Sequence, residues 1–422
     1  MSFIMRRRLH FAAASAAAIL GALASGRGAA ADPAPPFRDL LAQAQSSAPR
    51  LAEARAEIAR AEGLARQAGA RPNPIIGVEV ENFSGSGPYR GRDFAETTAS
   101  IAQTLELGGK RGARVAAGRA EVEAARRRAA EISAQFSFDL ADAYAQAEAS
   151  ERRLQLATEG LTLAEDDARV ATALVEAGRE ADLRRVQARA AVQAARAALE
   201  EARAARATAF GALTALAGAP APISAIPVSL LAEADRSIPV SLPDPLASPT
   251  YLAAQAAREA AARRIRVERT RAVPDVSVSV GVRKFQEDDA TAMVAGISAP
   301  FPLFDRNRGN ISAAQAELSA AEARLNAARL DAEADGRAGV ARVGAADSRL
   351  VAAREGERTA EEAYRLTRIG YEGGKLDLVE LLNARRALAE ARAQTVDAAL
   401  ERLSAQAALA RLQGRAPFGE QP

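Results

Sequence analysis

Two very long stretches without proline constrain this chain more than any other feature of its sequence. Residues 112–177 and 310–369 contain no proline, so each can form one continuous helix, roughly 100 Å and 90 Å long at ~1.5 Å per residue. Apolar residues recur in both stretches at alternating spacings of three and four, which is the pattern of a coiled-coil seam. The seam positions are Val122, Ala125, Ala129, Ile132 and Phe136 in the first stretch and Ile311, Ala314, Leu318, Ala321, Leu325 and Ala328 in the second.

Glycines end both stretches and predict that each long helix turns back on itself. Gly178 follows the first stretch, and Gly370, Gly373 and Gly374 follow the second. A further helical pattern of about 36 residues comes after each glycine turn. We therefore expect two antiparallel helical hairpins, in which arginine and glutamate cover the faces outside the alanine-rich seam and pair at i, i+4 spacing.

The hairpins belong to a tandem repeat with an offset of about 196 residues, a period longer than that of solenoid proteins. Ile101 corresponds to Ile297, and residues 216–218 correspond to residues 412–414. A segment rich in proline and serine separates the two copies. The expected division is a signal peptide at 1–31, a first repeat at 32–219, a linker at 220–249, a second repeat at 250–415 and a tail at 416–422.

Each repeat opens with a short helical segment, residues 37–68 or 250–271, and then changes to a period of two. Alternating apolar residues predict two strands in each repeat, joined by a polar connection. At about 10 to 13 residues, these strands suit a tilted crossing of a membrane, although a small soluble sheet is the alternative. The alternating positions are Ile76, Val78 and Val80; Ala99, Ile101, Gln103, Leu105 and Leu107; Val276, Val278, Val280 and Val282; and Met293, Ala295, Ile297, Ala299, Phe301 and Leu303.

The first 31 residues predict a secretory signal peptide. Residues 6–8 are arginines, residues 9–23 form an apolar run, and small residues precede Asp32, which is the order of regions in such a signal. A membrane anchor is the alternative, but it needs about 20 apolar residues. We expect cleavage near Ala31 and export of the mature chain, without an acyl group on a cysteine because the chain has no cysteine.

The mature chain lacks the residues on which several chemistries depend. The sequence has no cysteine, and its one histidine, His10, lies in the predicted signal. This excludes a Ser-His-Asp triad, a cysteine nucleophile, a zinc site of the usual kind and a thiolate-held iron–sulfur cluster. We therefore expect no enzyme activity, no cofactor and no metal site. Without residues 1–31 the formal charge changes from +3 to −1, and no basic block remains to favour nucleic acid.

Four strands cannot close a membrane barrel by themselves. The smallest membrane barrels have about eight strands, and open strand edges are not tolerated in lipid. Three copies around one axis would supply twelve strands and twelve helical rods. We therefore expect a homotrimer in which each mainly α-helical chain contributes four strands to a shared 12-stranded barrel.

With its tandem halves, strand hairpins, long helices and glycine turns, the chain resembles the TolC-like outer membrane efflux protein family, the exit ducts of tripartite pumps. The string LELGGKRGAR at 105–114, with Asn73 and Pro74, resembles the branch of the cobalt-zinc-cadmium type. The resemblance implies a TolC-like fold, with a periplasmic α-barrel attached to a barrel in the outer membrane. It also implies a passive duct for divalent heavy-metal cations, with a periplasmic membrane-fusion adaptor and an inner membrane pump of the resistance-nodulation-division type as partners.

The resemblance further implies where the duct meets its adaptor. Carried over by position, the docking tip contains Gly178, Glu180, Asp182, Tyr371, Gly374, Lys375 and Asp377. A second group, Gly108, Gly109, Lys110 and Arg111, forms a turn where the barrel meets water or lipid headgroups. For this turn we favour a structural role over contact with cargo.

The resemblance also implies where the duct narrows. Glu380 and Asn383 fall where constricting residues of the family project into the lumen. Three copies of Glu380 would form an anionic ring that favours cations over anions. The alternative is that Glu380 only pairs with an arginine such as Arg385 or Arg386.

Two other functions remain open from the sequence. Within the family, the duct could serve drugs, detergents or type I protein secretion. From a different class, the chain could be a periplasmic coiled-coil structural or adaptor protein that never inserts into a membrane. Strand hairpins of membrane length in both halves would then have no purpose.

Overall fold

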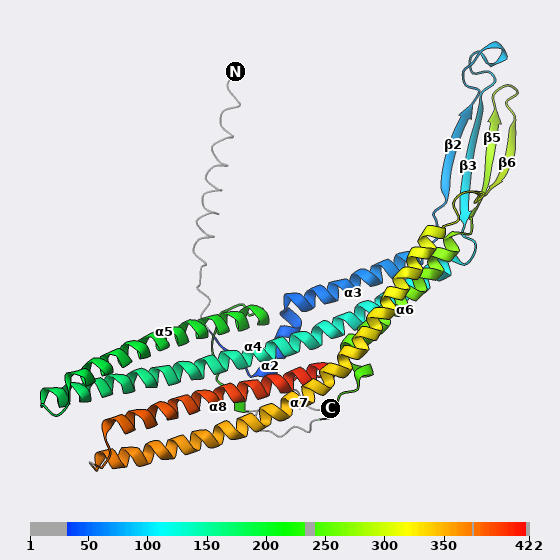
Figure 1. The fold of residues 1–422 in the computed structure, drawn as a ribbon. Coiled ribbons are helices and arrows are strands. Elements are labelled where there is room, and N and C mark those ends of the chain that lie inside the picture. Colours follow the sequence, from blue (N-terminus) through cyan, green and yellow to red (C-terminus); the bar gives the residue numbers. More distant parts are fainter. Residues whose placement is uncertain (1–31, 233–240, 374, 419–422) are drawn as a thin grey trace, which may run out of the picture. The chain divides into compact units, whose positions relative to one another are not determined.

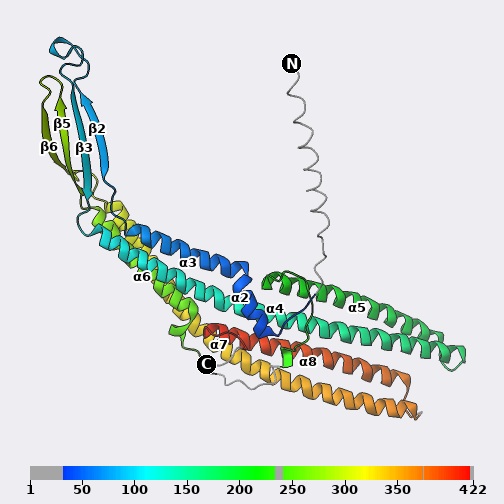
Figure 2. The same ribbon diagram turned by 180° about the vertical axis from the view of Figure 1, so that it is seen from behind.

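The computed structural model describes residues 32–232, 241–373 and 375–418. Its long helices are α4 (Lys110–Glu176) and α7 (Arg308–Glu372), and each is followed by a returning helix, α5 (Asp182–Ala217) or α8 (Leu378–Leu412) (Figure 1). The returning helices have 36 and 35 residues. The view from behind shows α4 beside α5 and α7 beside α8 (Figure 2). Both predicted helical hairpins are confirmed.

Shorter helices precede each long one. The sequence predicted one helical segment over 37–68, but the chain forms two helices there, because Pro49 cannot continue the helix before it and forces Ala48 into an extended conformation. The shorter elements are α2 (Phe37–Ser47), α3 (Pro49–Ala68) and α6 (Pro249–Arg271), with the 3-10 turns η1 (Gly87–Tyr89) and η3 (Pro245–Ala247).

The second helical turn begins later than the glycines predicted. Helix α7 continues through Gly370 and ends at Glu372. A Cβ at residue 370 would lie 2.6 Å from the side chain of Leu376, so glycine is needed here for a close approach and not for a helix break. Gly374 lies outside the described residues.

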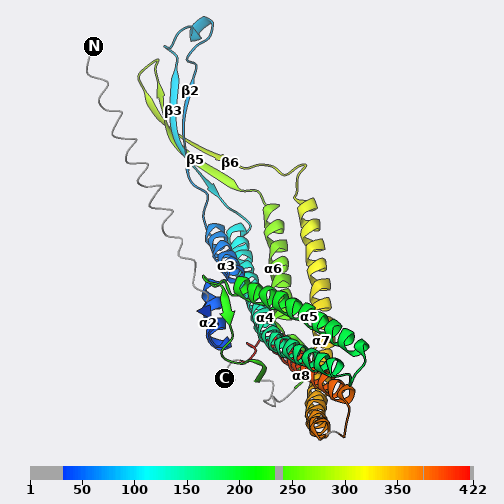
Figure 3. The same ribbon diagram turned by 90° about the vertical axis from the view of Figure 1, so that its left-hand side faces the viewer.

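Four antiparallel strands form one sheet in the order β2 (Ile75–Glu81), β3 (Glu96–Leu105), β5 (Val276–Phe285) and β6 (Thr291–Ser298) (Figure 1). Figure 3 shows the same four strands from the side. Strands β3 and β5 join the hairpin of the first repeat to that of the second. The outer strands have 7 and 8 residues, so the predicted length was too great for them. Strand β6 ends before Pro300 and Pro302, which have no backbone N–H to donate. Strands β1 (Asp32–Pro33) and β4 (Ile223–Ala225) form a separate parallel pair.

The chain divides into two compact units, and each takes segments from both repeats. The helical unit contains the described residues of 32–48, 140–232 and 347–404. The sheet unit contains those of 49–139, 241–346 and 405–418. No helix among the described residues combines the length and the apolar character of a membrane-spanning segment.

In the sheet unit, small residues and one arginine hold the helices together. Gly118 of α4 approaches α3 so closely that a Cβ there would lie 3.0 Å from the Cα of Ala65. Arg264 of α6 forms ion pairs with Glu121 of α4 and Glu317 of α7, so one guanidinium connects three helices. The predicted seam is confirmed by the burial of Phe136, Ala314, Ala321 and Ala328.

In the helical unit, two buried side chains of α4 hold the start of the linker. The Tyr144 ring packs edge-on against Phe37, and its hydroxyl donates to the Val228 carbonyl at 3.0 Å. The Glu148 carboxylate accepts from the backbone N–H groups of Leu230 and Leu231 at 2.7 and 3.0 Å. Because buried polar groups are tolerated only when they are hydrogen-bonded, these contacts fix the linker segment to α4.

The Tyr144 hydroxyl gives this contact a predicted pH dependence. Burial, with a smaller effect of the Glu148 carboxylate, raises the pKa of Tyr144 from 10.0 to about 12. The folded chain therefore holds this proton more tightly than the unfolded chain, and the contribution of Tyr144 to stability is complete below about pH 10 and is lost as the pH rises through about 12. We predict that the difference in unfolding free energy between the wild type and Tyr144→Phe shrinks across this window. Denaturant unfolding at a series of pH values measures it, and a constant difference would contradict the prediction.

Candidate functional site

One face of the four-stranded sheet is apolar and exposed. The strand registers align its side chains in rows that run across all four strands. Met293 is 85% exposed and Ile76 is 80% exposed, which is unusual for apolar side chains in water but typical of the lipid-facing side of a membrane sheet. Two adjacent rows consist of Ile76, Ile101, Val280 and Ala295, and of Val78, Ala99, Val282 and Met293.

The opposite face of the sheet is polar. Arg283 forms ion pairs of 2.8 Å with Glu81 and Glu96 and donates to the Thr98 hydroxyl at 2.9 Å. Serines and glycines fill much of the rest of this face. Apolar residues on one side and polar residues on the other are typical of a barrel wall whose interior holds water.

The sheet has two open edges. Strands β2 and β6 each pair with only one other strand among the described residues. The N–H and C=O groups on the outer side of each edge strand therefore need partners. The apolar face favours lipid, where water cannot supply those partners.

The turn between β3 and α4 is held by the chain itself. Gly108 and Gly109 have φ angles of +68° and +75°, which glycine adopts without strain. Lys110 pairs with Asp275 at 2.7 Å, and Arg111 donates to a backbone carbonyl at the end of α3 at 2.7 Å. The predicted boundary turn consists of Gly108, Gly109, Lys110 and Arg111. These four residues thus form part of the junction between the strands and the helices.

The turn of the first helical hairpin ends α4 with a Schellman motif. Gly178 has a φ of +69°, its N–H donates to the Val175 carbonyl at 3.0 Å, and the N–H of Arg179 donates to the Leu174 carbonyl at 2.9 Å. The two carboxylates predicted for the tip of this first hairpin each lie near an arginine. Their pairs are Glu180 with Arg184 at 3.9 Å and Asp182 with Arg185 at 2.5 Å.

The turn of the second helical hairpin is capped by an aspartate. A carboxylate oxygen of Asp377 accepts from the N–H of Glu380 at 2.9 Å, which satisfies a free donor at the start of α8. The Lys375 side chain is exposed and that of Tyr371 is half-buried. The predicted tip residues of each repeat thus lie at the turn of a helical hairpin, apart from Gly374, which is not described.

Exposed apolar side chains near both turns were not predicted as tip residues. They are Leu183 and Val186 on α5 and Leu366 and Ile369 on α7. Each pair has a spacing of three, so both members lie on one face of their helix. The sequence could have identified these four residues, because they are apolar, lie outside the coiled-coil seam and stand next to a glycine turn. Exposed apolar clusters of this kind typically mark contacts with other proteins.

The two predicted constricting residues are exposed on the first turns of α8. The side chains of Glu380 and Asn383 form no hydrogen bond or ion pair with any described residue. Arg385, one of the arginines considered as a partner for Glu380, is paired with Asp167 of α4 instead. Arg386 is exposed and likewise forms no ion pair with a described residue.

Arg385 joins three helices of the helical unit. Its guanidinium pairs with Asp167 of α4 and lies 5.9 Å from the ring centroid of Tyr364 on α7. Burial raises the pKa of Asp167, although the nearby guanidinium opposes this effect. For Arg385, burial lowers the pKa, but Asp167 and Tyr364 raise it by more. This pair therefore connects the two helical hairpins close to α8's first turns.

A family comparison identifies the chain. The model of a family described as outer membrane efflux protein matches residues 40–219 and 246–415, which is most of both repeats. The chain belongs to the outer membrane efflux protein family. It is therefore part of an efflux channel of the outer membrane and not an enzyme, as the sequence predicted. Membership of this family also argues against the alternative that the chain is a coiled-coil protein that never inserts into a membrane.

Individual relatives agree with this assignment. The efflux protein is 41% identical over 389 residues to the nickel-cobalt-cadmium resistance protein NccC of Alcaligenes xylosoxydans xylosoxydans, across 92% of this chain and 88% of the relative. It is 44% identical over 315 residues to the nickel and cobalt resistance protein CnrC of Cupriavidus metallidurans, across 74% and 75% of the two chains. The crystal structure of the outer membrane protein VceC from Vibrio cholerae matches with a TM-score of 0.74 at 23% identity, over 90% of this chain and 96% of that chain. The predicted fold is thus confirmed.

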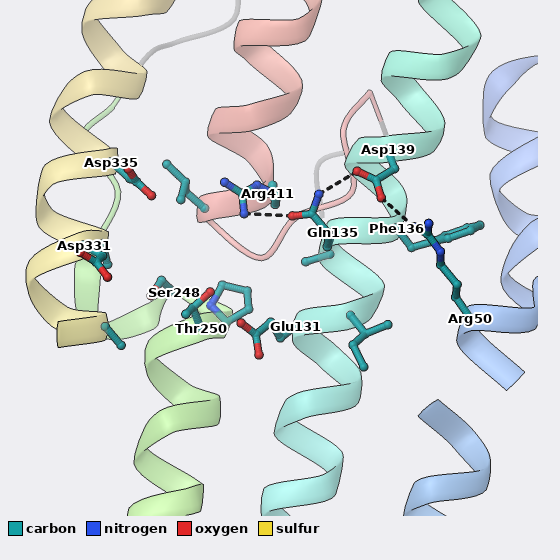
Figure 4. A pocket seen from close by; sticks show the side chains of 16 residues that line it. Arg50, Glu131, Gln135, Phe136, Asp139, Ser248, Thr250, Asp331, Asp335 and Arg411 are labelled. Carbon is teal, nitrogen blue, oxygen red and sulfur yellow. Dashed lines mark hydrogen bonds and ion pairs between the residues drawn. The ribbon is translucent and has the colours of Figure 1, made fainter. Parts of the chain in front are cut away.

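The sheet unit of the efflux protein contains a pocket of about 310 Å³. A chain of hydrogen bonds crosses one side of it, from Arg411 to Gln135, from Gln135 to Asp139, and from Arg50 to Asp139 (Figure 4). This chain connects α8, α4 and α3. Carboxylates also line the pocket, but no group of three or more acidic or histidine side chains in the described part of the chain is placed to hold a metal ion. The pocket is best explained as a gap bridged by polar contacts.

The contact of Arg385 with Asp167 predicts a specific loss of stability. Arg385→Gln leaves the half-buried Asp167 carboxylate without its partner, which costs about 2 kcal/mol of unfolding free energy. The neighbouring and exposed Arg386→Gln is the matched control and should change stability by less than about 0.5 kcal/mol. Hydrogen exchange of residues 378–390 and denaturant unfolding measure both effects, and equal behaviour of the two variants would contradict this role for Arg385.

Proposed function

We propose that three copies of this chain form one outer membrane duct with a shared 12-stranded barrel. The observation that carries the proposal is the sheet with one apolar face, one polar face and two open edges. Pairing β2 of one copy with β6 of the next would satisfy both edges and direct the polar face to the lumen. The helices that continue from the strands would then surround the same axis as a periplasmic α-barrel.

The route to the membrane follows from the start of the sequence. Residues 1–31 are proposed to direct export and to be removed near Ala31, which leaves a mature chain with no lipidated cysteine. The mature chain then consists of the repeats at 32–219 and 250–415, the linker at 220–249 and the tail at 416–422.

The duct is proposed to be passive and to open when a periplasmic membrane-fusion adaptor engages its tips. The turn residues Gly178, Glu180, Asp182, Tyr371, Gly374, Lys375 and Asp377 are the proposed docking site. Support comes from the exposed apolar pairs beside these turns, Leu183 with Val186 and Leu366 with Ile369, because such pairs would be covered by a partner. The inner membrane pump, of the resistance-nodulation-division type, would supply the energy.

The proposed cargo is divalent heavy-metal cations. The names of two relatives, a nickel-cobalt-cadmium resistance protein and a nickel and cobalt resistance protein, support this choice. Export of drugs, detergents or secreted proteins is the alternative. Because the mature sequence has no cysteine or histidine, it offers few ligands that bind such metals tightly, and selection of the cargo is assigned mainly to the pump.

Growth of a deletion strain tests the cargo. We predict that loss of this gene raises sensitivity to nickel, cobalt, zinc or cadmium salts, and that the restored gene reverses it. The strain should grow normally with detergents and antibiotics. Sensitivity to drugs and detergents without any to metals would keep the duct but refute the cargo.

Glu380 and Asn383 are proposed to line the narrowest part of the duct. Three Glu380 carboxylates around one axis would attract cations, and the absence of an ion-pair partner for Glu380 among the described residues leaves its charge available. We predict that Glu380→Gln lowers the ratio of cation to anion permeability in single-channel recordings by about twofold or more. Glu390→Gln, farther along the same helix and also exposed, is the control. An unchanged ratio in Glu380→Gln would count against the ring.

A further inference from the structure

The end of the sheet next to the helices has an unusual excess of positive charge. Four segments meet there, residues 66–71, 106–114, 266–275 and 299–308, and we call them together the junction patch. They contain ten basic and four acidic residues. The loops at the opposite end of the same strands, residues 82–95 and 286–290, contain two basic and four acidic residues. The two ends of one membrane-length sheet therefore carry opposite net charge.

Contacts between side chains and backbone groups bring the segments of the junction patch together. Asp275 accepts from the N–H of Leu107 at 3.2 Å and pairs with Lys110 at 2.7 Å. The amide of Asn307 donates to the Glu268 carbonyl at 2.7 Å. Segments from both repeats are thus joined within the sheet unit, so their charges act on one surface and not on four separate ones.

The acidic residues of the junction patch are already engaged, while many of its arginines are not. Glu106 pairs with Arg114, and Glu268 pairs with Arg271 at 2.6 Å. The exposed arginines that form no ion pair with a described residue include Arg66, Arg71, Arg111, Arg269, Arg306 and Arg308. Arg111 and Arg306 each donate to a backbone carbonyl, but no carboxylate neutralises these arginines, so the patch keeps a net positive charge that attracts an anion.

Large apolar side chains lie among these arginines. Phe304 is 94% exposed and Phe301 is 85% exposed, and both belong to the segment between β6 and α7 that ends in Arg306 and Arg308. An apolar ring beside an arginine suits the boundary of a bilayer, where the ring enters the acyl region and the guanidinium reaches the phosphate layer. Arginine also matches phosphate oxygens in a bidentate manner.

We infer that the junction patch binds the phosphate groups of anionic phospholipids in the leaflet on the helical side of the membrane. This inference rests on the proposed duct, because only an inserted sheet brings the patch to a leaflet. A negatively charged leaflet attracts nearby arginines, whereas the opposite end, with its net negative loops, is repelled by such lipids. The patch thereby fixes the depth and the direction of the sheet in the membrane.

Lipid binding to the full mature chain in detergent tests the inference. Native mass spectrometry with phosphatidylglycerol and with phosphatidylcholine measures the apparent affinity for an anionic and a zwitterionic lipid of equal chain length. The wild type should bind phosphatidylglycerol about tenfold or more tightly than phosphatidylcholine. Equal affinities would overturn the inference.

A matched pair of variants separates the patch from net charge. Arg71→Gln, Arg269→Gln, Arg306→Gln and Arg308→Gln together remove four unpaired arginines of the patch. The control combines Arg128→Gln, Arg324→Gln, Arg337→Gln and Arg342→Gln, which are exposed residues of α4 and α7 with no ion pair to a described residue. The patch variant should lose about tenfold of its affinity for phosphatidylglycerol, and the control should retain its affinity. Equal losses would show an effect of net charge and overturn the inference.

Two further measurements complete the test. The first identifies which molecule supplies the bound phosphate, and the second shows whether the chain is inserted in the membrane at all. Inorganic phosphate and lipopolysaccharide are added as competitors, and displacement of phosphatidylglycerol by either at equal concentration would overturn a phospholipid site. Carbonate extraction of cell membranes reports insertion. Release of the wild-type chain would refute the duct, whereas a chain that stays in the membrane but shows no lipid preference would refute only this inference.

Discussion

The open edges of the four-stranded sheet are the constraint on which the rest of this structure depends. One face of the sheet favours lipid, and lipid offers no partner for the free N–H and C=O groups of β2 and β6. One chain cannot close such a sheet with so few strands. The proposed assembly of several copies around one axis answers this constraint, and the helices would share that symmetry because only a short turn separates β3 (Glu96–Leu105) from α4 (Lys110–Glu176).

Close approach of small residues and ion pairs between helices both contribute to the packing of the helical parts. Alanines occupy much of the seam, and Gly118 brings α4 almost into backbone contact with α3. Single arginines such as Arg264 then connect several helices at once.

Local patterns in the sequence predicted the helices and strands well, but they could not predict contacts between residues that are far apart in the chain. The spacing of Ala314, Ala321 and Ala328 identifies the buried seam because helix periodicity is a local property. Strand β6 was predicted too long because alternation continues into Phe301 and Leu303, where prolines end the sheet. The pairing of Arg385 with Asp167 joins residues 218 positions apart, and no periodicity reports such a contact. The junction patch likewise emerges only when four segments of the two repeats meet.

The proposed duct gives different roles to different exposed surfaces of the efflux protein. In the proposed duct, the sheet and the junction patch would face the membrane, and the helical turns, with their exposed apolar pairs, would contact other proteins. Neither region has the ligands of a selective metal site within the described residues.

The number of chains in the purified protein tests the central claim most directly. Native mass spectrometry of the mature chain, extracted from the membrane in a mild detergent and freed of lipid in the instrument, counts the copies in one complex. The account predicts three. A single chain, or a pair, that had been stably inserted in the outer membrane would contradict it, because its sheet edges would then have been satisfied in some way other than the one proposed.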